Sequence, residues 1–173
     1  AINTLTETGG IIIRTPLPVA VVDRLCRNPR VTYVPELPNE NNLAPPLLVI
    51  GGTYEHGMAV QQIFHNMSKV LIGQAVVVSA VEAAFIEGGI CSLSVLQRTF
   101  FNQLHDAISE YGGDYDVVST YTSLDGRVGM GHTLVPNLDY SRGEKSQAYI
   151  NGFDRLRTFG GTNPDSRPIT LLH

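Results

Sequence analysis

Histidine is the first residue type to consider, because imidazole serves both metal binding and acid–base chemistry at neutral pH. The chain has five histidines: His56, His65, His105, His132 and His173. A metal site on one helix needs two ligands three or four residues apart, and no two of these histidines have that spacing. Glu55 and His56 could pair a general base with the carboxylate that orients it, but a solvated loop pair is the interpretation we favour.

The two cysteines, Cys26 and Cys91, are the next candidates. One disulfide bond could join them, but two reduced thiols are favoured, because secreted disulfide scaffolds carry more cysteine. Cys91 stands just before a predicted helix, and a helix N-terminus lowers a thiol pKa and can activate a nucleophile. A buried structural cysteine is the simpler interpretation. An alternative function, a small oligomeric enzyme with an intersubunit site, would use Glu55, His56, Cys91, His105 and His132.

Three carboxylates, Glu110, Asp114 and Asp116, fall within seven residues and could hold a calcium or magnesium ion. The EF-hand spacing is absent, so a solvated loop is the favoured interpretation. The glycine-rich run from Gly126 to Gly131 matches neither the dinucleotide nor the Walker pattern. We therefore predict no catalytic residue, no cofactor and no metal.

Arginine gives the best functional indication. Arg24, Arg27 and Arg30 are three residues apart, and further arginines and aromatic residues alternate in the last quarter of the chain. Arginine and aromatic side chains together can bind single-stranded nucleic acid, which makes a nucleic-acid-coating protein another alternative. Acidic residues lie among the same arginines, so ion pairs between subunits explain the mixture better.

Composition also favours a protein whose surface is used in contacts. Charged residues make up 16% of the chain, against about 25% in typical soluble domains. Ten of the twelve basic residues are arginine, which interfaces prefer to lysine. The net charge of −4 does not favour nucleic acid.

The sequence begins without the basic and apolar segments of a signal peptide, so we expect a virion or cytoplasmic location rather than secretion. The longest apolar run, residues 70–86, contains Gln74, Ser79 and Glu82 and is short for a membrane span. We interpret it as a buried helix and expect no membrane contact.

One domain with three parts is predicted. Residues 1–52 should form an extended arm with short strands at 11–13, 31–34 and 47–50, and a strand or short helix at 19–25. Four prolines exclude a helix from 35–46. The core should span 53–140. Residues 141–173 should form a helix over 144–159 and a second extended arm.

The core is predicted to be an antiparallel helix pair packed with a β-hairpin, which gives an α+β fold. Apolar residues from Ile63 to Phe85 recur at helical spacing, and Gly88-Gly89 should end that helix. A second helix carries Leu93, Leu96, Phe100, Leu104 and Ile108 on one face, with Ser94 and Gln97 as a capping box. Residues 117–123 and 127–135 should form the hairpin around Asp125-Gly126.

The sequence therefore predicts a structural, self-assembling subunit. Its extended arms would bind neighbouring copies, and a virion coat, tail or connector protein is the setting we favour. Other assembly proteins could take part, and nucleic acid is a less favoured partner. The predicted contact residues are Ile11, Ile12, Ile13, Arg24, Arg27, Leu47, Ile50, Arg155, Arg157, Leu171 and Leu172.

Overall fold

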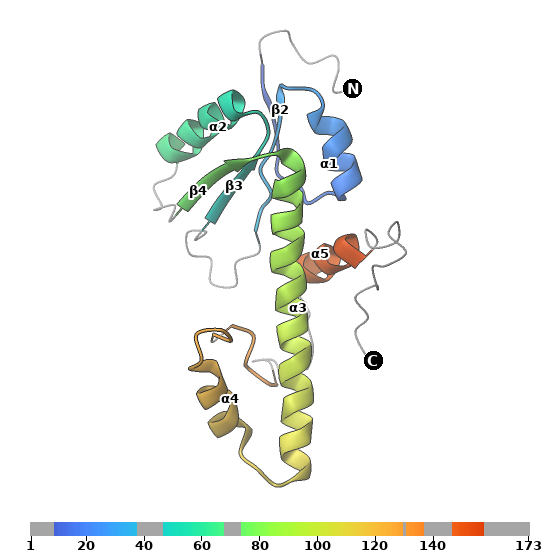
Figure 1. Cartoon of the computed structure of the whole chain (residues 1–173), viewed down its shortest axis with the longest axis vertical. Helices are drawn as coiled ribbons and strands as arrows, with labels where there is room; N and C mark the ends of the chain where they lie inside the picture. The colour runs from blue at the N-terminus through green and yellow to red at the C-terminus, as the bar shows by residue number, and fades with distance from the viewer. Residues whose placement is uncertain (1–8, 38–46, 68–73, 130, 137–146, 158–173) are drawn as a thin grey trace. The chain divides into compact units, whose positions relative to one another are not determined.

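The structure is a computed structural model that describes residues 9–37, 47–67, 74–129, 131–136 and 147–157. The chain divides into two compact units, residues 1–89 and 90–173. The described residues contain helices and one small mixed sheet, so the predicted α+β class is confirmed (Figure 1).

The first unit contains the four-stranded sheet, in the order β1-β2-β3-β4. The strands are β1 (Ile11–Ile13), β2 (Val31–Tyr33), β3 (Leu47–Gly51) and β4 (Gln74–Val78). β1 runs parallel to β2 and β3 runs parallel to β4, whereas β2 and β3 are antiparallel. The three strands expected before residue 52 are confirmed, and the fourth was not foreseen.

Helices cover both faces of this sheet, as Figure 1 shows. α2 (Tyr54–Met67) lies on one face, where Val60 and Phe64 pack with Leu48 and Ile50. α1 (Val19–Cys26) and the first turn of α3 (Ala80–Glu110) lie on the other. Their side chains share a core whose buried members are Val19, Val22, Tyr33, Val49, Ala80, Ala83 and Ala84. Each parallel strand pair is joined through one of the helices α1 and α2.

The described part of the N-terminal segment is folded into this sheet and the helices that cover it. Tyr33, Val34 and Ile50 are completely buried in the unit to which they belong. The three short apolar runs gain a shared sheet and two covering helices. Their side chains are thereby buried within one copy of the chain, and binding of this segment to neighbouring subunits stays a prediction.

The predicted helix from Ile63 to Phe85 is also wrong. The β-branched residues Val76 to Val78 extend alongside β3 as the strand β4. α3 begins directly afterwards with a reciprocal capping box. Glu82 donates its backbone N–H to the Ser79 hydroxyl at 3.2 Å, and Ser79 donates its own to a Glu82 carboxylate oxygen at 2.8 Å. α3 then continues through Gly88 and Gly89 for 31 residues, so those glycines do not end it.

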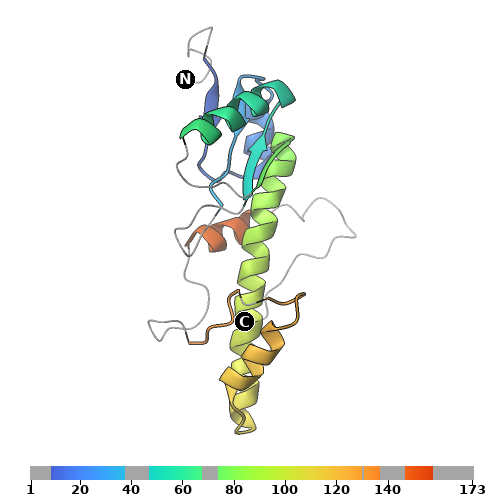
Figure 2. The same ribbon diagram turned by 90° about the vertical axis from the view of Figure 1, so that its left-hand side faces the viewer.

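In the second unit, the predicted hairpin is replaced by a helix, α4 (Tyr115–Ser123). Asp114 begins it, because its carboxylate accepts hydrogen bonds from the backbone N–H groups of Asp116 and Val117. Gly112, with φ of 69°, lets the chain reverse after α3. Figures 1 and 2 show α4 running back beside α3. Asp125-Gly126 forms a helical turn, since the Asp125 carbonyl accepts from Val128 and Gly129.

The last described element is α5 (Gln147–Arg157), which confirms the helix expected near residues 144–159. Its Tyr149 packs with Cys91 and Val95 of α3. By length and composition alone α3 could cross a membrane, and 44% of its most apolar window is buried within the structure. A core helix of a folded unit meets the same criterion of length and composition.

Candidate functional site

A buried polar cluster in the second unit centres on Arg98 of α3. The Arg98 side chain is 9% exposed, and its Nη2 lies 3.1 Å from Nδ1 of His132. His132 adopts a left-handed backbone conformation with φ of 60°, which is uncommon for a residue with a side chain. The His132 ring meets the Tyr149 ring edge-on, with 5.5 Å between centroids. α3, the segment after α4 and α5 thus contribute one residue each.

Two of the five candidates for an enzyme site come near each other here. Cys91 is fully buried and packs with Tyr149, the same ring that His132 contacts. Both cysteines are free thiols. However, Cys91 lies within α3, more than two turns beyond its first residue, so the expected effect of a helix N-terminus on the thiol does not apply.

The other three candidates have separate surroundings. His105 packs against the Tyr115 ring with 4.9 Å between centroids, and its Nδ1 lies 3.6 Å from Asp106. His56 belongs to the start of α2, where its Nδ1 lies 2.9 Å from the Thr53 hydroxyl. Glu55 lies in the first turn of the same helix, in the first unit.

The acidic residues after α3 stabilise the start of α4. Asp114 caps α4, and Asp116 lies in the first turn, where a negative charge is favoured. Burial, helped by the charge of Asp116, raises the pKa of the Tyr115 hydroxyl. That hydroxyl donates a hydrogen bond to the Thr133 carbonyl at 2.5 Å. Among the described residues, no group of three or more His, Cys, Asp or Glu side chains could hold a metal ion.

A row of exposed and partly exposed side chains, apolar except for Gln103, runs along α3 within the second unit. Leu93 and Phe100 are 58% and 52% exposed. With them we group the side chains at alternating spacings of three and four residues and call the set the α3 seam: Leu93, Leu96, Phe100, Gln103 and Ala107. This is the spacing with which two helices pair in a coiled coil.

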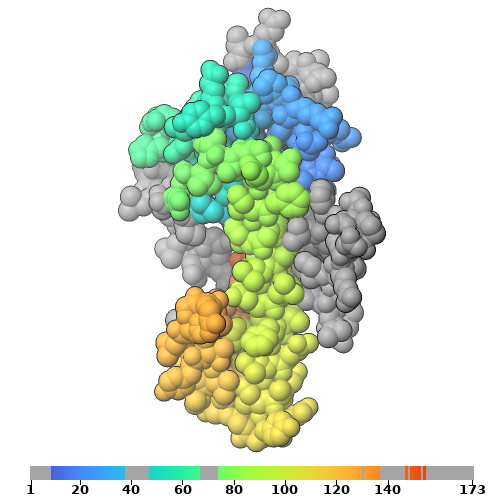
Figure 3. Space-filling model, viewed as in Figure 1, coloured from blue at the N-terminus to red at the C-terminus, as the bar shows by residue number. Residues whose placement is uncertain are grey.

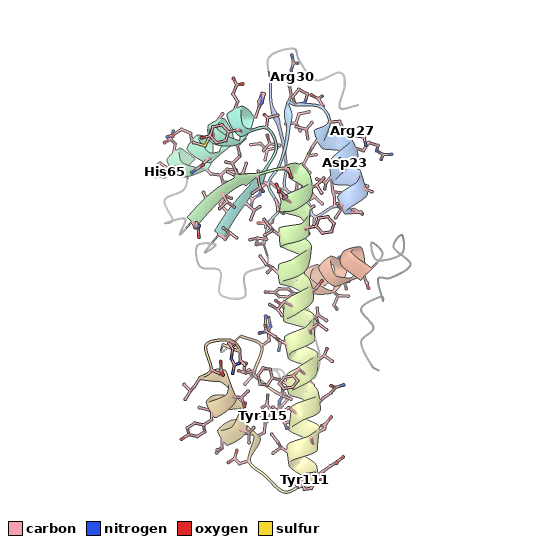
Figure 4. All side chains as sticks on the ribbon, in the orientation of Figure 1. Asp23, Arg27, Arg30, His65, Tyr111 and Tyr115 are labelled. Carbon is pink, nitrogen blue, oxygen red and sulfur yellow. The ribbon has the colours of Figure 1, made fainter. Side chains whose placement is uncertain are left out.

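The adjoining side of α3 is the packed one. Phe101, Leu104 and Ile108 pack against Tyr115 and Val135. The sequence placed Leu104 and Ile108 on the same face as Leu93 and Phe100, and the structure divides them between packed and exposed sides. The heptad spacing from Leu93 to Ala107 is the signal in the sequence that distinguishes the exposed side from the packed side. Figure 3 shows the α3 surface beside α4, and Figure 4 shows Tyr115 between the two helices.

Several predicted contact residues lie in the first unit. Ile11, Ile12 and Ile13 form the edge strand β1, and the middle residue is 38% exposed. Arg24 and Arg27 lie on α1, where Arg27 donates to Asp23 at 2.9 Å (Figure 4). Because Asp23 neutralises one of these arginines, the basic charge available to nucleic acid on this helix is smaller than the sequence indicated.

None of the contact predictions is tested, so all of them stay predictions. Ile50 is completely buried and Leu47 partly buried, which gives both a packing role inside their own unit. Arg155 and Arg157 belong to α5, but their side chains lie outside the described part. Leu171 and Leu172 also lie outside the described residues.

A cavity of about 350 Å³ lies between α2 and the sheet. Leu48, Met58 and Ala75 form its apolar part, and Gln61, Gln62 and His65 its polar part. Gln62 already donates to Asn66 at 3.1 Å. Figure 4 shows His65 on α2. These residues present no pairing of acid, base and nucleophile, so we assign no chemistry to this cavity.

Comparison with known proteins shows the fold alone. No protein-family model matches the sequence, and no curated protein matches it. Among solved structures, the chain is similar to a UDP-glucose dehydrogenase from the hyperthermophilic archaeon Pyrobaculum islandicum, with 19% sequence identity and a TM-score of 0.56. The likeness covers 70% of this chain and 31% of that one, so the chain spans about a third of the length of the enzyme.

Proposed function

We propose that this chain is a structural subunit that associates with further copies of itself through the α3 seam. The observation that supports the proposal is the exposure of Leu93 and Phe100, two large apolar side chains seven residues apart on one helix. Water penalises such a row, and an identical row on a second copy is complementary to it in shape and polarity. Knobs-into-holes packing of two such helices would cover both rows at once.

The native mass of the full chain tests this proposal. We expect light scattering of the unmodified protein to give a mass of two or more chains of 18.8 kDa each. Phe100→Glu should lower that mass, because it places a charge in the middle of the seam. Ser109→Glu is the matched control, since it adds the same charge at an exposed α3 position on the opposite side from the seam. A mass of 18.8 kDa for the unmodified chain would contradict the proposal.

The setting that we propose for this association is a virion coat, tail or connector. Its support is compositional: charged residues are scarce, and arginine outnumbers lysine ten to two. Subunits of many-copy particles have much of their surface in contacts, where such composition is favoured. A native particle of only two copies would contradict the virion setting and leave self-association intact.

A second candidate function is an enzyme that handles a nucleotide sugar. The likeness to a UDP-glucose dehydrogenase favours it, as do the contacts of Cys91 and His132 with Tyr149 and of Arg98 with His132. Its test is a thermal shift with UDP-glucose. We expect the ligand to raise the melting temperature of the unmodified chain, and to raise that of Arg98→Met by less. No thermal shift for the unmodified chain would contradict this candidate.

A further inference from the structure

The cavity between α2 and the sheet lies where a small side chain on β4 leaves space under the helix. At Gly57 an added Cβ atom would overlap the Val77 side chain, so α2 and β4 are in close contact there. Ala75 lies two residues earlier on the same face of β4 and offers only a methyl group. Its register partner on β3, Leu48, supplies the adjoining part of the cavity floor. The space that Val77 fills at one end of the helix is therefore open at the other.

The helix contributes one row of side chains to this cavity. Met58, Gln61, Gln62 and His65 follow one another at helical spacing and lie on one side of α2. Gln62 and His65 are exposed and Met58 is 42% exposed, so the cavity is open to solvent along this row. Its volume of about 350 Å³ falls within the range of roughly 300–1,000 Å³ that is usual for small-molecule sites.

The polar side chains of the row have hydrogen-bonding capacity left for a ligand. Within the described part of the chain, neither the Gln61 amide nor the His65 ring has a hydrogen-bond partner, and Gln62 uses only its Nε2, on Asn66. An amide and a neutral imidazole each present a donor and an acceptor. None of the described lining residues is Asp, Glu, Lys or Arg. These side chains suit a neutral ligand with donors and acceptors along one edge.

We propose that this cavity binds a neutral, flat heterocycle of the purine type. A glutamine amide matches the edge of adenine, where the exocyclic amine donates and a ring nitrogen accepts. Leu48 and Ala75 would cover the apolar face of the ring, and Met58 would pack against it, because a thioether contacts aromatic rings favourably. The cavity would hold this ligand without reacting with it.

The position of the cavity makes this inference independent of both proposed functions. Leu48 and Ala75 are the second residues of β3 and β4, so the cavity lies at the amino ends of these two parallel strands. Open parallel sheets bind nucleotides beyond the carboxyl ends of their strands. The α3 seam belongs to the second unit, whereas all the described lining residues belong to the first.

Equilibrium dialysis of the full chain against adenine tests the proposal. We expect saturable binding of one adenine per chain. A purine with a methyl group in place of the amine should bind about three- to tenfold more weakly, because it loses one hydrogen bond. AMP should bind no more tightly than adenine, since no described lining side chain is a cation. Tighter binding of AMP would indicate a phosphate site elsewhere and would overturn the proposal, as would the absence of saturable binding.

Two substitutions locate the ligand. Ala75→Leu should fill the cavity and weaken adenine binding by about tenfold or more. Ala59→Leu is the matched control, because it adds the same atoms at an exposed α2 position that does not line the cavity. Gln61→Leu should weaken adenine binding about three- to tenfold and remove the preference for adenine over the methyl analogue.

The outcomes of these variants decide the proposal whatever the mass of the native particle. Unchanged adenine affinity in Ala75→Leu would show that the ligand lies elsewhere. A melting temperature of Ala75→Leu well below that of Ala59→Leu would show that the space is not available, and this result also overturns the proposal. A monomeric chain that binds adenine would overturn self-association and leave this inference intact.

Discussion

The guanidinium group of Arg98 donates a hydrogen bond to Nδ1 of His132, across 3.1 Å in space and 34 positions in sequence. A guanidinium group has no acceptor, so Nδ1 must contribute its lone pair and the ring hydrogen of the neutral imidazole must sit on Nε2. Because Arg98 is 9% exposed, the bond lies largely away from water. It ties the segment that follows α4 to the middle of α3.

Arg98→Met should test the contribution of this tie. Methionine preserves much of the buried stem but removes the donors, so we expect the free energy of unfolding to fall by about 1–3 kcal/mol. Chemical denaturation monitored by circular dichroism measures it. Arg127→Met is the control, because it removes an exposed arginine whose ion pair with Asp125 should contribute little. Equal stability of the two variants would show that the Arg98 bond is not structural.

The neighbouring phenylalanines of α3 should respond differently to truncation. Phe101 is 1% exposed and Phe100 is 52% exposed. Phe101→Ala should cost about 3–5 kcal/mol of unfolding free energy, because it leaves a cavity beside Tyr115 and Val135. Phe100→Ala should change it by about 0.5 kcal/mol or less. Both variants should also carry Leu93→Glu, because this substitution suppresses association through the α3 seam.

Two adjacent glycines at the end of β3 form another matched pair. A Cβ atom at Gly51 would lie 2.6 Å from the Ala83 Cβ and 2.8 Å from the Ala80 Cα, where α3 begins. Gly51→Ala should therefore lower the free energy of unfolding by about 1–3 kcal/mol through overpacking. At Gly52 the nearest atoms are 3.6 Å away, an ordinary contact, so Gly52→Ala should be tolerated. Thermal unfolding of the two variants would decide the matter, and equal melting temperatures would count against the close approach of β3 and α3.

The capping box at the start of α3 should make stability depend on pH. Hydrogen bonds from the side chain and backbone of Ser79 lower the pKa of Glu82 below its ordinary value of 4.5. A carboxyl group with a lowered folded-state pKa stabilises the fold fully above its unfolded pKa and loses that contribution as pH falls through the folded value.

Ser79→Ala should remove the contribution of Glu82 to the fall in unfolding free energy at acid pH. It should also cost about 1 kcal/mol at pH 7, as the loss of an N-cap does. Denaturation midpoints from pH 7 to pH 3 measure both effects. Glu82→Gln should keep the uncharged hydrogen bonds and lose only the pH dependence. An unchanged acid limb in both variants would show that Glu82 does not contribute.

The sequence predicted the elements that have short-range signals. The runs at Ile11–Ile13, Val31–Tyr33 and Leu47–Gly51 are strands because β-branched and aliphatic residues stand between proline and glycine turns. Their assembly into a sheet could not be read from them, because pairing depends on contacts between residues distant in the chain. For this reason the N-terminal segment looked like an arm.

The errors in the middle of the chain arose where two patterns compete. Val76 to Val78 suit a strand, but apolar residues before and after them also recur at helical spacing, and that longer pattern predicts a helix. Gly88-Gly89 is typical of a helix end, yet packing along α3 outweighs the cost of about 1 kcal/mol per interior glycine. The alternation from Val117 to Ser123 favoured a strand, whereas the Asp114 cap and the spacing of Tyr115, Ser119 and Ser123 favour the observed helix.

The candidate cluster could not be predicted, because Arg98, His132 and Tyr149 are 34 and 17 positions apart and share no motif. The sequence did contain the heptad of the α3 seam. It was hidden because Phe100 and Phe101 are adjacent and only one of them faces the core. Exposure, which is a property of the folded chain, separates the two.

The narrow buried face of α4 has a consequence for local opening. Its buried residues are Tyr115, Ser119 and Ser123, whereas Val117 and Tyr121 are 50% and 70% exposed. A segment with few buried apolar contacts opens at a lower free energy than the core of the same protein does. The backbone amides of α4 should therefore exchange with deuterium sooner than those around the buried Phe101 of α3.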